Sequence, residues 1–528
     1  MLFKHLCRRD AVLVLFGAAC FYTFSAVSVL NAGPEYHEQI VTEPPAMQTV
    51  SPVLKQAVPV DLGLVQDFPE TSVVAHAPGW TIFRNLYMSS GSLLLVTRDP
   101  SQFPEHRMMT STGLPGNLTN DAQRIPTPKE MAFVTPEEAK RRWGGDINTR
   151  NRVSTVEGTT LLFNDPPQFL NHYFHFVAEL MFGSWAFLYG AFHDQTAKPS
   201  AASTNPSFNP PLLPTSVPTI NRAIFIHSDV DGWRDGPGFN GYFMRAVFPS
   251  MTIEVATDWI DRVNATANTE IGRAWHFPLV LLTDRSAAFR GSICGAYTQR
   301  TAAEAWTVMA KAGKIDLIGN WWAGIRTSLA RYAGGGPHED ENLPSVLQVP
   351  DTVVITYINR QGTRRHLRDE DNRALIAAVE ELIARKNRQG GKRWEFNNVH
   401  AEQISLDEQI QFAAKTTIML GVHGNGLTHL VFMKPTRVSA VVEMFIPGGF
   451  ARDYEWTTRS LGMTHYSVWN NESFTHPHEP VLPDYPDGFH GPNIPLDGPF
   501  VARLIEQHVA MKEKGVPSVD NSPVHDQH

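Results

Sequence analysis

A glycine-rich turn joins two apolar segments in the stretch Thr417-Ile418-Met419-Leu420-Gly421-Val422-His423-Gly424-Asn425-Gly426-Leu427-Thr428-His429. Residues 417–422 predict a buried strand, and residues 426–433 predict a short helix that must end before Pro435. Glycines let the backbone approach a ligand closely, and the first N–H groups of a helix suit a phosphate or a sugar hydroxyl. A turn without a ligand is the alternative, because the spacing matches neither the dinucleotide nor the phosphate-loop pattern.

Strands and helices alternate regularly around this turn. The apolar periodicity predicts a strand at 351–358, a helix at 370–388, a strand at 394–399, a helix at 406–415, strands at 417–422 and 438–445, a helix at 452–461 and a strand at 463–468. Ser405 and Glu408 have the spacing of a capping box at the start of one of these helices. Such alternation predicts a parallel, Rossmann-like sheet, in which ligands bind at the carboxyl ends of the strands.

Three arginines follow the first strand of this sheet, at the edge where the glycine-rich turn is expected. Arg360, Arg364 and Arg365 could pair with phosphate oxygens and form a cradle for a nucleotide diphosphate. The alternative is a solvated basic loop, balanced by the acidic residues at 369–371. Glu443 ends the strand after the turn and could accept hydrogen bonds from a ribose, although a strand-end carboxylate has equally good structural uses.

The amino-terminal half contains a long apolar helix at residues 170–192 with three polar side chains, His172, His175 and Glu179. His175 and Glu179 lie four residues apart, so they share one face of the helix and could act as a general-base pair. A contact that only satisfies a half-buried histidine is the alternative. Strands are expected at 92–96 and 159–163, and a helix is expected to begin after a Thr135 cap.

Two apolar strands, 222–229 and 278–284, each end in a carboxylate, as parallel strands of α/β domains often do. Asp229 and Asp231 form an Asp-x-Asp pair of the kind that can hold a metal-bound diphosphate, but Asp also opens turns and Gly232 follows. A turn is therefore the competing interpretation. Cys294 fits a buried apolar site better than a nucleophile.

Length and composition narrow the class of protein. The chain has 528 residues, which favours two folded domains with appendages. Its net charge of −8 argues against nucleic acid as a partner. The expected divisions are a cytosolic tail at 1–10, a membrane anchor at 11–30, a stem at 31–70, an α/β domain at 71–333 with a loop insertion at 196–220, a linker at 334–350, a Rossmann-like domain at 351–510 and a tail at 511–528.

The amino terminus predicts a single-pass type II membrane protein. Residues 11–30 carry no charge and are long enough to cross a bilayer, while Lys4, Arg8 and Arg9 precede them, which places the body in the lumen. A cleaved signal peptide is the alternative. Asn117, Asn264 and Asn471 begin glycosylation sequons. The carboxyl terminus lacks an endoplasmic reticulum retrieval signal, so the Golgi membrane is favoured over the endoplasmic reticulum.

Three blocks of this sequence resemble glycosyltransferase family 61, which contains plant xylosyl- and arabinosyltransferases and animal lumenal N-acetylglucosaminyltransferases. The blocks are residues 171–179, 357–365 and 421–433. The resemblance implies two facing Rossmann-like domains in the GT-B arrangement and an inverting reaction with a UDP-linked sugar donor. Asn425 and His429 depart from the residues that many relatives have, Ala and Asn, which leaves the sugar open.

The combined expectation is an inverting transferase that moves xylose or N-acetylglucosamine from a UDP-sugar to a hydroxyl group of a glycan or glycoprotein. Glu179 or His175 would be the base. The expected donor-binding residues are Arg360, Arg364, Arg365, Gly421, His423, Gly424, Asn425, Gly426, Leu427, Thr428 and Glu443. No metal is required, although Asp229 and Asp231 leave manganese or magnesium open. A membrane-anchored glycan-binding protein with an inactive transferase fold is the alternative.

Overall fold

A computed structural model describes residues 68–115, 120–144, 152–193, 213–214, 216–268, 270, 272–288, 301–335 and 346–515. The chain divides into Met1–Asp61 and Leu62–His528, and all of the described residues belong to the second unit. None of the described helices combines the length and apolar character that crossing a bilayer requires. The anchor predicted at 11–30, the tails and most of the stem lie outside the described residues.

The first sheet has nine strands and is mixed. Its main path runs β4 (Met131–Val134), β3 (Ser92–Val96), β2 (Trp80–Ser89), β9 (Ala274–Thr283), β6 (Thr159–Phe163), β7 (Ile220–Phe225) and β8 (Thr252–Glu254), while β1 (Ser72–Ala77) pairs with β2 and β5 (Val153–Thr155) with β9. The strands from β9 to β8 are parallel, but β2 runs antiparallel to β9. The parallel part therefore presents its carboxyl ends at one edge.

The second sheet has six strands in the order β11 (Arg393–His400), β10 (Thr352–Asn359), β12 (Ile418–Val422), β13 (Ala440–Phe445), β14 (Thr464–Trp469) and β15 (Glu472–Phe474). All except β15 are parallel. In chain order the five parallel strands read 2-1-3-4-5, the doubly wound order whose ligand site lies between strands 1 and 3. This switch point falls between β10 and β12.

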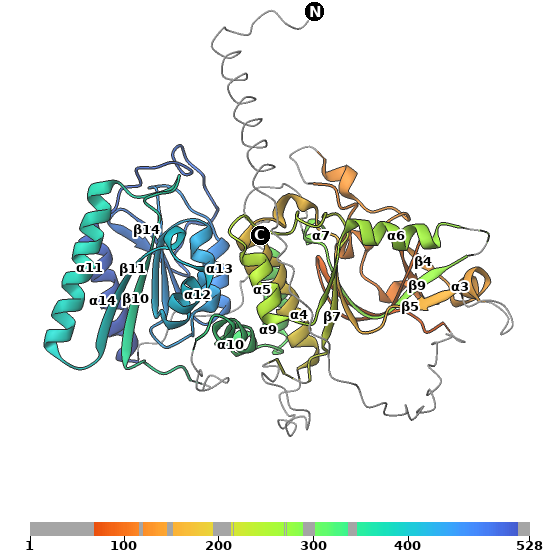
Figure 1. Ribbon diagram of the computed structural model, residues 1–528, viewed down its shortest axis with the longest axis horizontal. Coiled ribbons are helices and arrows are strands. Elements are labelled where there is room, and N and C mark those ends of the chain that lie inside the picture. The colour runs from red at the N-terminus through yellow and green to blue at the C-terminus, as the bar shows by residue number, and fades with distance from the viewer. Residues whose placement is uncertain are drawn as a thin grey trace, which may run out of the picture. The chain divides into compact units, whose positions relative to one another are not determined.

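Helices cover both faces of the second sheet (Figure 1). The helices α11 (Asp369–Gln389) and α14 (Gly498–Glu513) contact each other and share one buried cluster with β10, β12 and β13. The other face is covered by α12 (Leu406–Lys415), the 3-10 helix η7 (Asn425–Phe432) and α13 (Asp453–Ser460). Apolar side chains therefore occupy both faces, which explains the continuous apolar runs in these strands.

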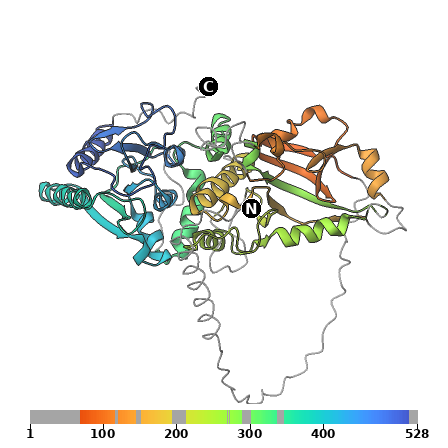
Figure 2. The same cartoon turned by 90° about the horizontal axis from the view of Figure 1, so that it is seen from above.

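One buried cluster extends from the first sheet to the second. It joins residues of β2, β6 and β7 to the π-helix η4 (Phe174–Met181), α4 (Phe182–Phe192), α5 (Phe239–Val247), α9 (Thr301–Lys311), the 3-10 helix η5 (Asn320–Trp322) and α10 (Ala323–Tyr332), and then to α12, η7 and α13. Trp322 donates from its indole N–H to the carbonyl of Val431 at 2.8 Å. Figure 2 shows these helices from a second direction.

The opposite face of the first sheet carries smaller elements. The helix α6 (Ala256–Thr266) packs there through Trp259. This tryptophan belongs to a third buried cluster, which also contains Met109 of α2 (His106–Met109). The remaining short elements are η1 (Pro100–Gln102), η2 (Asp121–Arg124), α3 (Pro136–Trp143), η3 (Pro167–Phe169), α7 (Arg285–Ala288) and η6 (Ala401–Gln403). Consecutive residues of β6 point to opposite faces of the sheet. Leu161 therefore belongs to the cluster that joins the two sheets, and Leu162 belongs to the third cluster.

Most predicted elements of the second half are confirmed to within two residues. The caps are confirmed as well, since Ser405 and Glu408 form the capping box and the Thr135 hydroxyl accepts from the Glu138 N–H. Two helices differ from the expected α geometry, because η7 is a 3-10 helix and the helix predicted at 170–192 starts later, with the π-helix η4 at Phe174. Both lie where the halves of the site meet, and π-turns are frequent at functional sites.

Candidate functional site

The glycine-rich turn and the arginine loop lie side by side at the switch point of the second sheet. The turn follows β12 and the loop follows β10, and these two strands pair in parallel. Arg365 donates from Nη1 to the carbonyl of His423 at 3.0 Å, and Arg360 does so at 3.4 Å. The sequence placed these residues at one edge, and the structure brings them into contact.

Glycine is required at position 424 for two reasons. Its φ of +144° with ψ of −177° is a conformation that residues with a side chain rarely adopt. A Cβ there would also lie 2.0 Å from Nη1 of Arg360. Gly421 and Gly426 pack against apolar neighbours, because a Cβ would lie 2.7 Å from Leu427 and 2.8 Å from Ile358 respectively. Gly424 thus allows the guanidinium of Arg360 to lie on the backbone of the turn.

Positive charge is concentrated beside this turn. Arg360 and Arg365 are half-buried and Arg364 is exposed. Burial lowers the pKa of Arg360 and of Arg365, and the charge of Arg364 lowers both further. Glu402 is an acidic neighbour that raises the pKa of Arg360. An anion bound between the three guanidinium groups would relieve their mutual repulsion, which is the electrostatic property expected of a diphosphate site.

His175 and Glu179, which were predicted to act together as a general base, are in contact on the π-helix. His175 Nδ1 and Glu179 Oε2 lie 2.7 Å apart. Arg285, which follows β9, donates from Nη1 to the same Glu179 oxygen at 2.9 Å and to the carbonyl of His175 at 2.6 Å. The Nε of Arg285 also binds Asp165 at 2.8 Å. The glutamate is thus fixed from two sides.

The exposure of the pair separates the roles that its two members can have. The His175 side chain is 28% exposed, whereas the Glu179 side chain is only 6% exposed. Burial raises the pKa of Glu179, but the charges and hydrogen bonds of His175 and Arg285 outweigh burial and hold it below its ordinary value. Glu179 is therefore a buried carboxylate that orients His175, and the imidazole is the more exposed member of the pair.

A hydrogen bond connects this pair to the glycine-rich turn. The backbone N–H of Phe174, adjacent to His175, donates to Oδ1 of Asn425 at 3.1 Å. The hydroxyl of Thr428 donates to the same oxygen at 3.4 Å. Leu427 is buried in the core beneath the turn. Asn425, which was predicted to bind the donor, thus uses its side-chain amide oxygen to position the π-helix that carries His175 and Glu179.

Asp453 is a further acidic group of the site, and it was not among the residues predicted from the sequence. It begins α13 after β13 and is half-buried. Burial and then the negative charge of Glu179 raise the pKa of Asp453 to about 7, while the charges of His175 and Arg365 oppose the shift. Asp453 therefore lies close enough to the His175–Glu179 pair and to the arginine loop for their charges to shift its pKa. Its place in the first turn of a helix at the carboxyl edge was the available signal.

Glu443 and His423 form a buried pair under the turn. Oε1 of Glu443 contacts Nδ1 of His423, and its Oε2 lies 2.8 Å from Nε2 of His465. Burial raises the pKa of Glu443 well above its ordinary value and lowers the pKa of His423 well below its ordinary value. Both carboxylate oxygens thus have protein partners, so the contacts observed for Glu443 support the structural use that the sequence left open.

His429 also has structural partners. Its Nδ1 lies 2.9 Å from the hydroxyl of Tyr173, and its Nε2 lies 2.9 Å from Oε1 of Gln409. Burial lowers the pKa of His429 to about 4. The imidazole is therefore neutral near pH 7, with Nε2 donating to Gln409 and Nδ1 accepting from Tyr173. It connects the first block of the site to the second sheet.

We expect His429→Ala to lower the free energy of unfolding by about 2–4 kcal/mol at pH 7.5, because Tyr173 and Gln409 lose a buried partner. The loss should shrink by about 2 kcal/mol at pH 5, since the unfolded wild type then binds a proton that the folded imidazole excludes. A folded-state pKa depressed in this way contributes stability above about pH 6.5 that is lost as the pH falls towards 4. Urea unfolding of wild type and variant at both pH values measures this, and a pH-independent difference would contradict it.

The Asp-x-Asp pair forms an exposed turn. Oδ1 of Asp229 accepts from the N–H groups of Asp231 and Gly232, at 3.1 and 2.6 Å. The side chain of Asp231 is 87% exposed. These contacts match the turn interpretation, and metal dependence stays a prediction. Among the described residues a group with metal-ligand geometry occurs elsewhere, at Glu455, His476 and Glu479, where Arg459 and Arg452 already pair with Glu455.

The sequons differ in their setting. Asn264 is exposed on α6, and Asn471 is exposed in the turn between β14 and β15. Asn117 and Cys294 lie outside the described residues, as do most of the 196–220 insertion and most of the 334–350 linker.

The site of this α/β protein thus places a histidine–carboxylate pair beside a glycine-rich turn and an arginine loop at a sheet switch point, where ligands of such sheets bind. The family described as Glycosyltransferase 61 matches residues 173–441, about half of the chain. The chain belongs to this family. The resemblance found in the sequence is confirmed, and the match includes the His175–Glu179 pair, the arginine loop and the glycine-rich turn.

A curated relative matches a shorter segment. The chain is similar to the EGF domain-specific O-linked N-acetylglucosamine transferase of Drosophila melanogaster, with 29% identity over 92 residues. The match covers 16% of this chain and 16% of the relative. It supports a glycosyltransferase.

Proposed function

We propose that this protein is an inverting glycosyltransferase that moves a sugar from a UDP-linked donor to a hydroxyl group of a glycan or glycoprotein in the secretory pathway. One observation carries the proposal. The hydrogen bond from Phe174 to Asn425 holds the histidine–carboxylate pair against the turn that, with the arginine loop, suits a diphosphate. The two sheets with their carboxyl edges at this site support a GT-B arrangement.

In the proposed reaction, the acceptor hydroxyl attacks the anomeric carbon as the bond to the diphosphate breaks. His175 accepts the hydroxyl proton through Nε2, while Glu179 holds Nδ1–H and stabilises the imidazolium that forms. Negative charge builds on the departing UDP. Arg360, Arg364 and Arg365 face this charge together with the N–H groups after Gly424, so they stabilise the transition state more than the ground state.

The activity named for the Drosophila melanogaster relative favours N-acetylglucosamine as the sugar, and xylose is the second candidate. The proposed type II topology with a lumenal body rests on residues 1–30, whose sequence favours a signal anchor, and the Golgi membrane is the proposed location. The proposed mechanism uses no metal step, since guanidinium groups and backbone N–H groups supply the charge stabilisation.

A donor screen tests the proposed function. The full-length chain is assayed for thermal stabilisation and sugar release with UDP-xylose, UDP-N-acetylglucosamine, UDP-glucose, UDP-galactose and GDP-mannose, with manganese or with EDTA. We expect one UDP-sugar to stabilise the chain and to be hydrolysed slowly, with little change in EDTA. Glycan binding without any response to nucleotide would instead favour an inactive, glycan-binding protein.

A further inference from the structure

An irregular segment, residues 475–497, joins β15 to α14 at the carboxyl edge of the second sheet. Asp484 of this segment exchanges two backbone hydrogen bonds of 2.9 Å with Phe450, which follows β13. Further along, the N–H of Ile494 donates to the carbonyl of His366, which follows β10, at 3.1 Å. Since β12 lies between β13 and β10 in the sheet, the segment passes beside the glycine-rich turn that follows β12.

Phe489 lies between these two anchors and contacts the turn. Its ring centre is 5.2 Å from that of His423 and 6.1 Å from that of Phe445, the last residue of β13. The guanidinium carbon of Arg365 lies 5.7 Å from the centre of the same ring. Phe489 is buried, so it attaches the segment to the turn and to the arginine loop.

Two exposed aromatic side chains pack on Phe489. Tyr485 and His490 each meet its ring edge to face, with ring centres 4.7 and 5.0 Å away. Their own planes are nearly parallel, at 18°, with centres 6.1 Å apart. Tyr485 is 43% exposed, and His490 is exposed as well. A flat ligand can therefore reach both rings, and little side-chain freedom is lost on binding because Phe489 already holds them.

His490 lies beside the exposed end of the arginine loop. Burial lowers the pKa of His490, and the positive charges of Arg365 and then Arg364 lower it further. The imidazole is therefore neutral near pH 7, so it can stack on a neutral ring without adding charge to the loop. The two exposed rings thus adjoin the predicted diphosphate site.

The chemistry of a nucleotide sugar sets its direction in this site. The sugar and the nucleoside are attached to opposite ends of the diphosphate, and the sugar has to lie towards His175, which receives the acceptor proton in the proposed reaction. The charges of the histidine–carboxylate pair act on Asp453, whereas the charges that act on His490 are those of the arginine loop. Asp453 therefore lies on the side of the sugar, and His490 lies on the side where the nucleoside extends.

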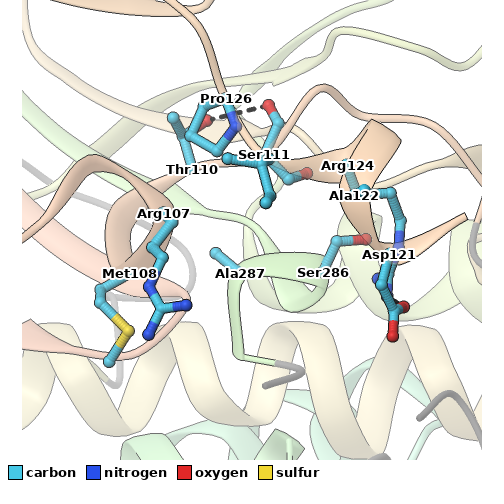
Figure 3. A pocket seen from close by; sticks show the side chains of 11 residues that line it. Arg107, Met108, Thr110, Ser111, Asp121, Ala122, Arg124, Pro126, Ser286 and Ala287 are labelled. Carbon is cyan, nitrogen blue, oxygen red and sulfur yellow. Dashed lines mark hydrogen bonds and ion pairs between the residues drawn. The ribbon is translucent and has the colours of Figure 1, made fainter. Parts of the chain in front are cut away.

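A cavity of about 290 Å³ in the first half of the protein is separate from these groups. Figure 3 shows Ser286 and Ala287 of α7 between Arg107 of α2 and Asp121 of η2. None of the residues that line the cavity belongs to the arginine loop, the glycine-rich turn or the 475–497 segment. The cavity is therefore not a continuation of the donor site, and the exposed rings beside the arginine loop are the better place for a donor nucleoside.

We propose that Tyr485 and His490 form a stacking platform for the nucleobase of the donor. The inference rests on the proposed function and assigns a place to the part of a UDP-sugar that the arginine loop and the turn do not hold. Aromatic side chains can stack on any base, because every base has a π-face. The platform therefore adds affinity for the nucleoside, while the arginines supply the affinity for the diphosphate.

Comparing UDP with inorganic pyrophosphate separates the two contributions. Tyr485→Ala should weaken UDP binding by about 5–150-fold and leave pyrophosphate binding within about twofold, because the substitution removes a stacking ring and no charge. His490→Ala should change the two affinities in the same directions. Tyr485→Phe keeps the ring and should keep most of the UDP affinity. Calorimetric titration of the full-length chain gives these values, and an equal loss for both ligands, or no loss for UDP, overturns the proposal.

Tyr332→Ala is the matched control. Tyr332 on α10 is also exposed, at 55%, and it also packs edge to face on an aromatic ring, that of Tyr242 at 5.0 Å. It lies outside the contacts of the donor site, so the control should keep the UDP affinity. Thermal unfolding of each variant checks that the fold is kept before the titrations.

Saturation-transfer NMR observes the base directly. With the wild-type chain, the H5 and H6 protons of uracil should receive more saturation than the ribose protons, and Tyr485→Ala should lose this excess. Binding of both UDP and pyrophosphate without saturation of the uracil protons overturns the platform and leaves the donor site intact. Binding of neither ligand overturns the proposed function, and this inference with it.

Discussion

His175→Gln should reduce kcat by about 10²–10⁴-fold, the usual contribution of a positioned general base, and leave the Kd for UDP within about twofold. The reason is the division of roles in the pair, in which the buried Glu179 carboxylate orients the more exposed imidazole. Glutamine keeps polar atoms at the site but cannot accept the proton. Single-turnover kinetics for kcat and calorimetry for UDP provide the measurement.

Glu179→Gln and the double variant sharpen this test. Glu179→Gln should lower kcat without changing the KM for the donor, since Arg285 keeps its other acceptor, Asp165. Residues that act as a unit are strongly non-additive, so the double variant should be little slower than His175→Gln alone. Asp453→Asn is the comparison, because the pKa of Asp453 is about 7 and its carboxylate could take the proton instead. A larger loss in Asp453→Asn than in His175→Gln would transfer the role of base to the aspartate.

Gly424→Ala should raise the Kd for UDP at least about tenfold, although no charge is removed. The added Cβ would lie 2.0 Å from Nη1 of Arg360, so the guanidinium must leave the turn. One charged hydrogen bond is worth roughly 1.5–3 kcal/mol, which corresponds to about 10–150-fold in affinity. Calorimetric titration with UDP measures the change, and wild-type affinity in Gly424→Ala would remove Arg360 from the donor site.

A double-mutant cycle distinguishes this effect from backbone strain. If Gly424→Ala acts by displacing Arg360, then adding it to Arg360→Ala should weaken UDP binding little further. Gly390→Ala is the control for backbone strain, because Gly390 also combines a positive φ (+76°) with an extended ψ (−179°), and no atom lies within 4 Å of the position that a Cβ would take there. The control should lose thermal stability because of its backbone strain, about 1–3 kcal/mol, and keep its UDP affinity. Independent, additive losses in the cycle would contradict the displacement.

The apolar periodicity of the sequence was sufficient to predict the strands and helices in the second half of the fold. Its parallel strands are buried on both faces, and its helices are separated by caps and glycines, so the boundaries can be located from local rules. The first sheet was harder to predict, because β2 and β9 are far apart in sequence and pair antiparallel, and β2 also runs antiparallel to β1 and β3. Long-range pairing of this kind leaves no local signal. The Rossmann-like prediction therefore describes the second sheet better than the mixed first sheet.

The site shows the same division. His175, Glu179, the arginine loop and the glycine-rich turn could be predicted, because residue type and spacing can be read directly from the sequence. Contacts across the site were not visible, and for this reason the sequence did not reveal that Asn425 binds the Phe174 N–H or that His429 binds Tyr173. Arg285 was also missed, although it directly follows a predicted strand that ends in a carboxylate. The π-helix depends on packing and has no propensity signal of its own.

The buried cluster that joins the two sheets has a consequence for engineering the protein. The helices at 301–332 precede the linker in sequence, yet Trp321 and Trp322 donate their indole N–H groups to carbonyls of Ser460 and Val431 in the second half. A chimera that exchanges donor specificity with a relative therefore cannot be cut at the linker alone. The transplanted piece has to begin upstream, near residue 301, so that the tryptophans travel with the surface against which they pack.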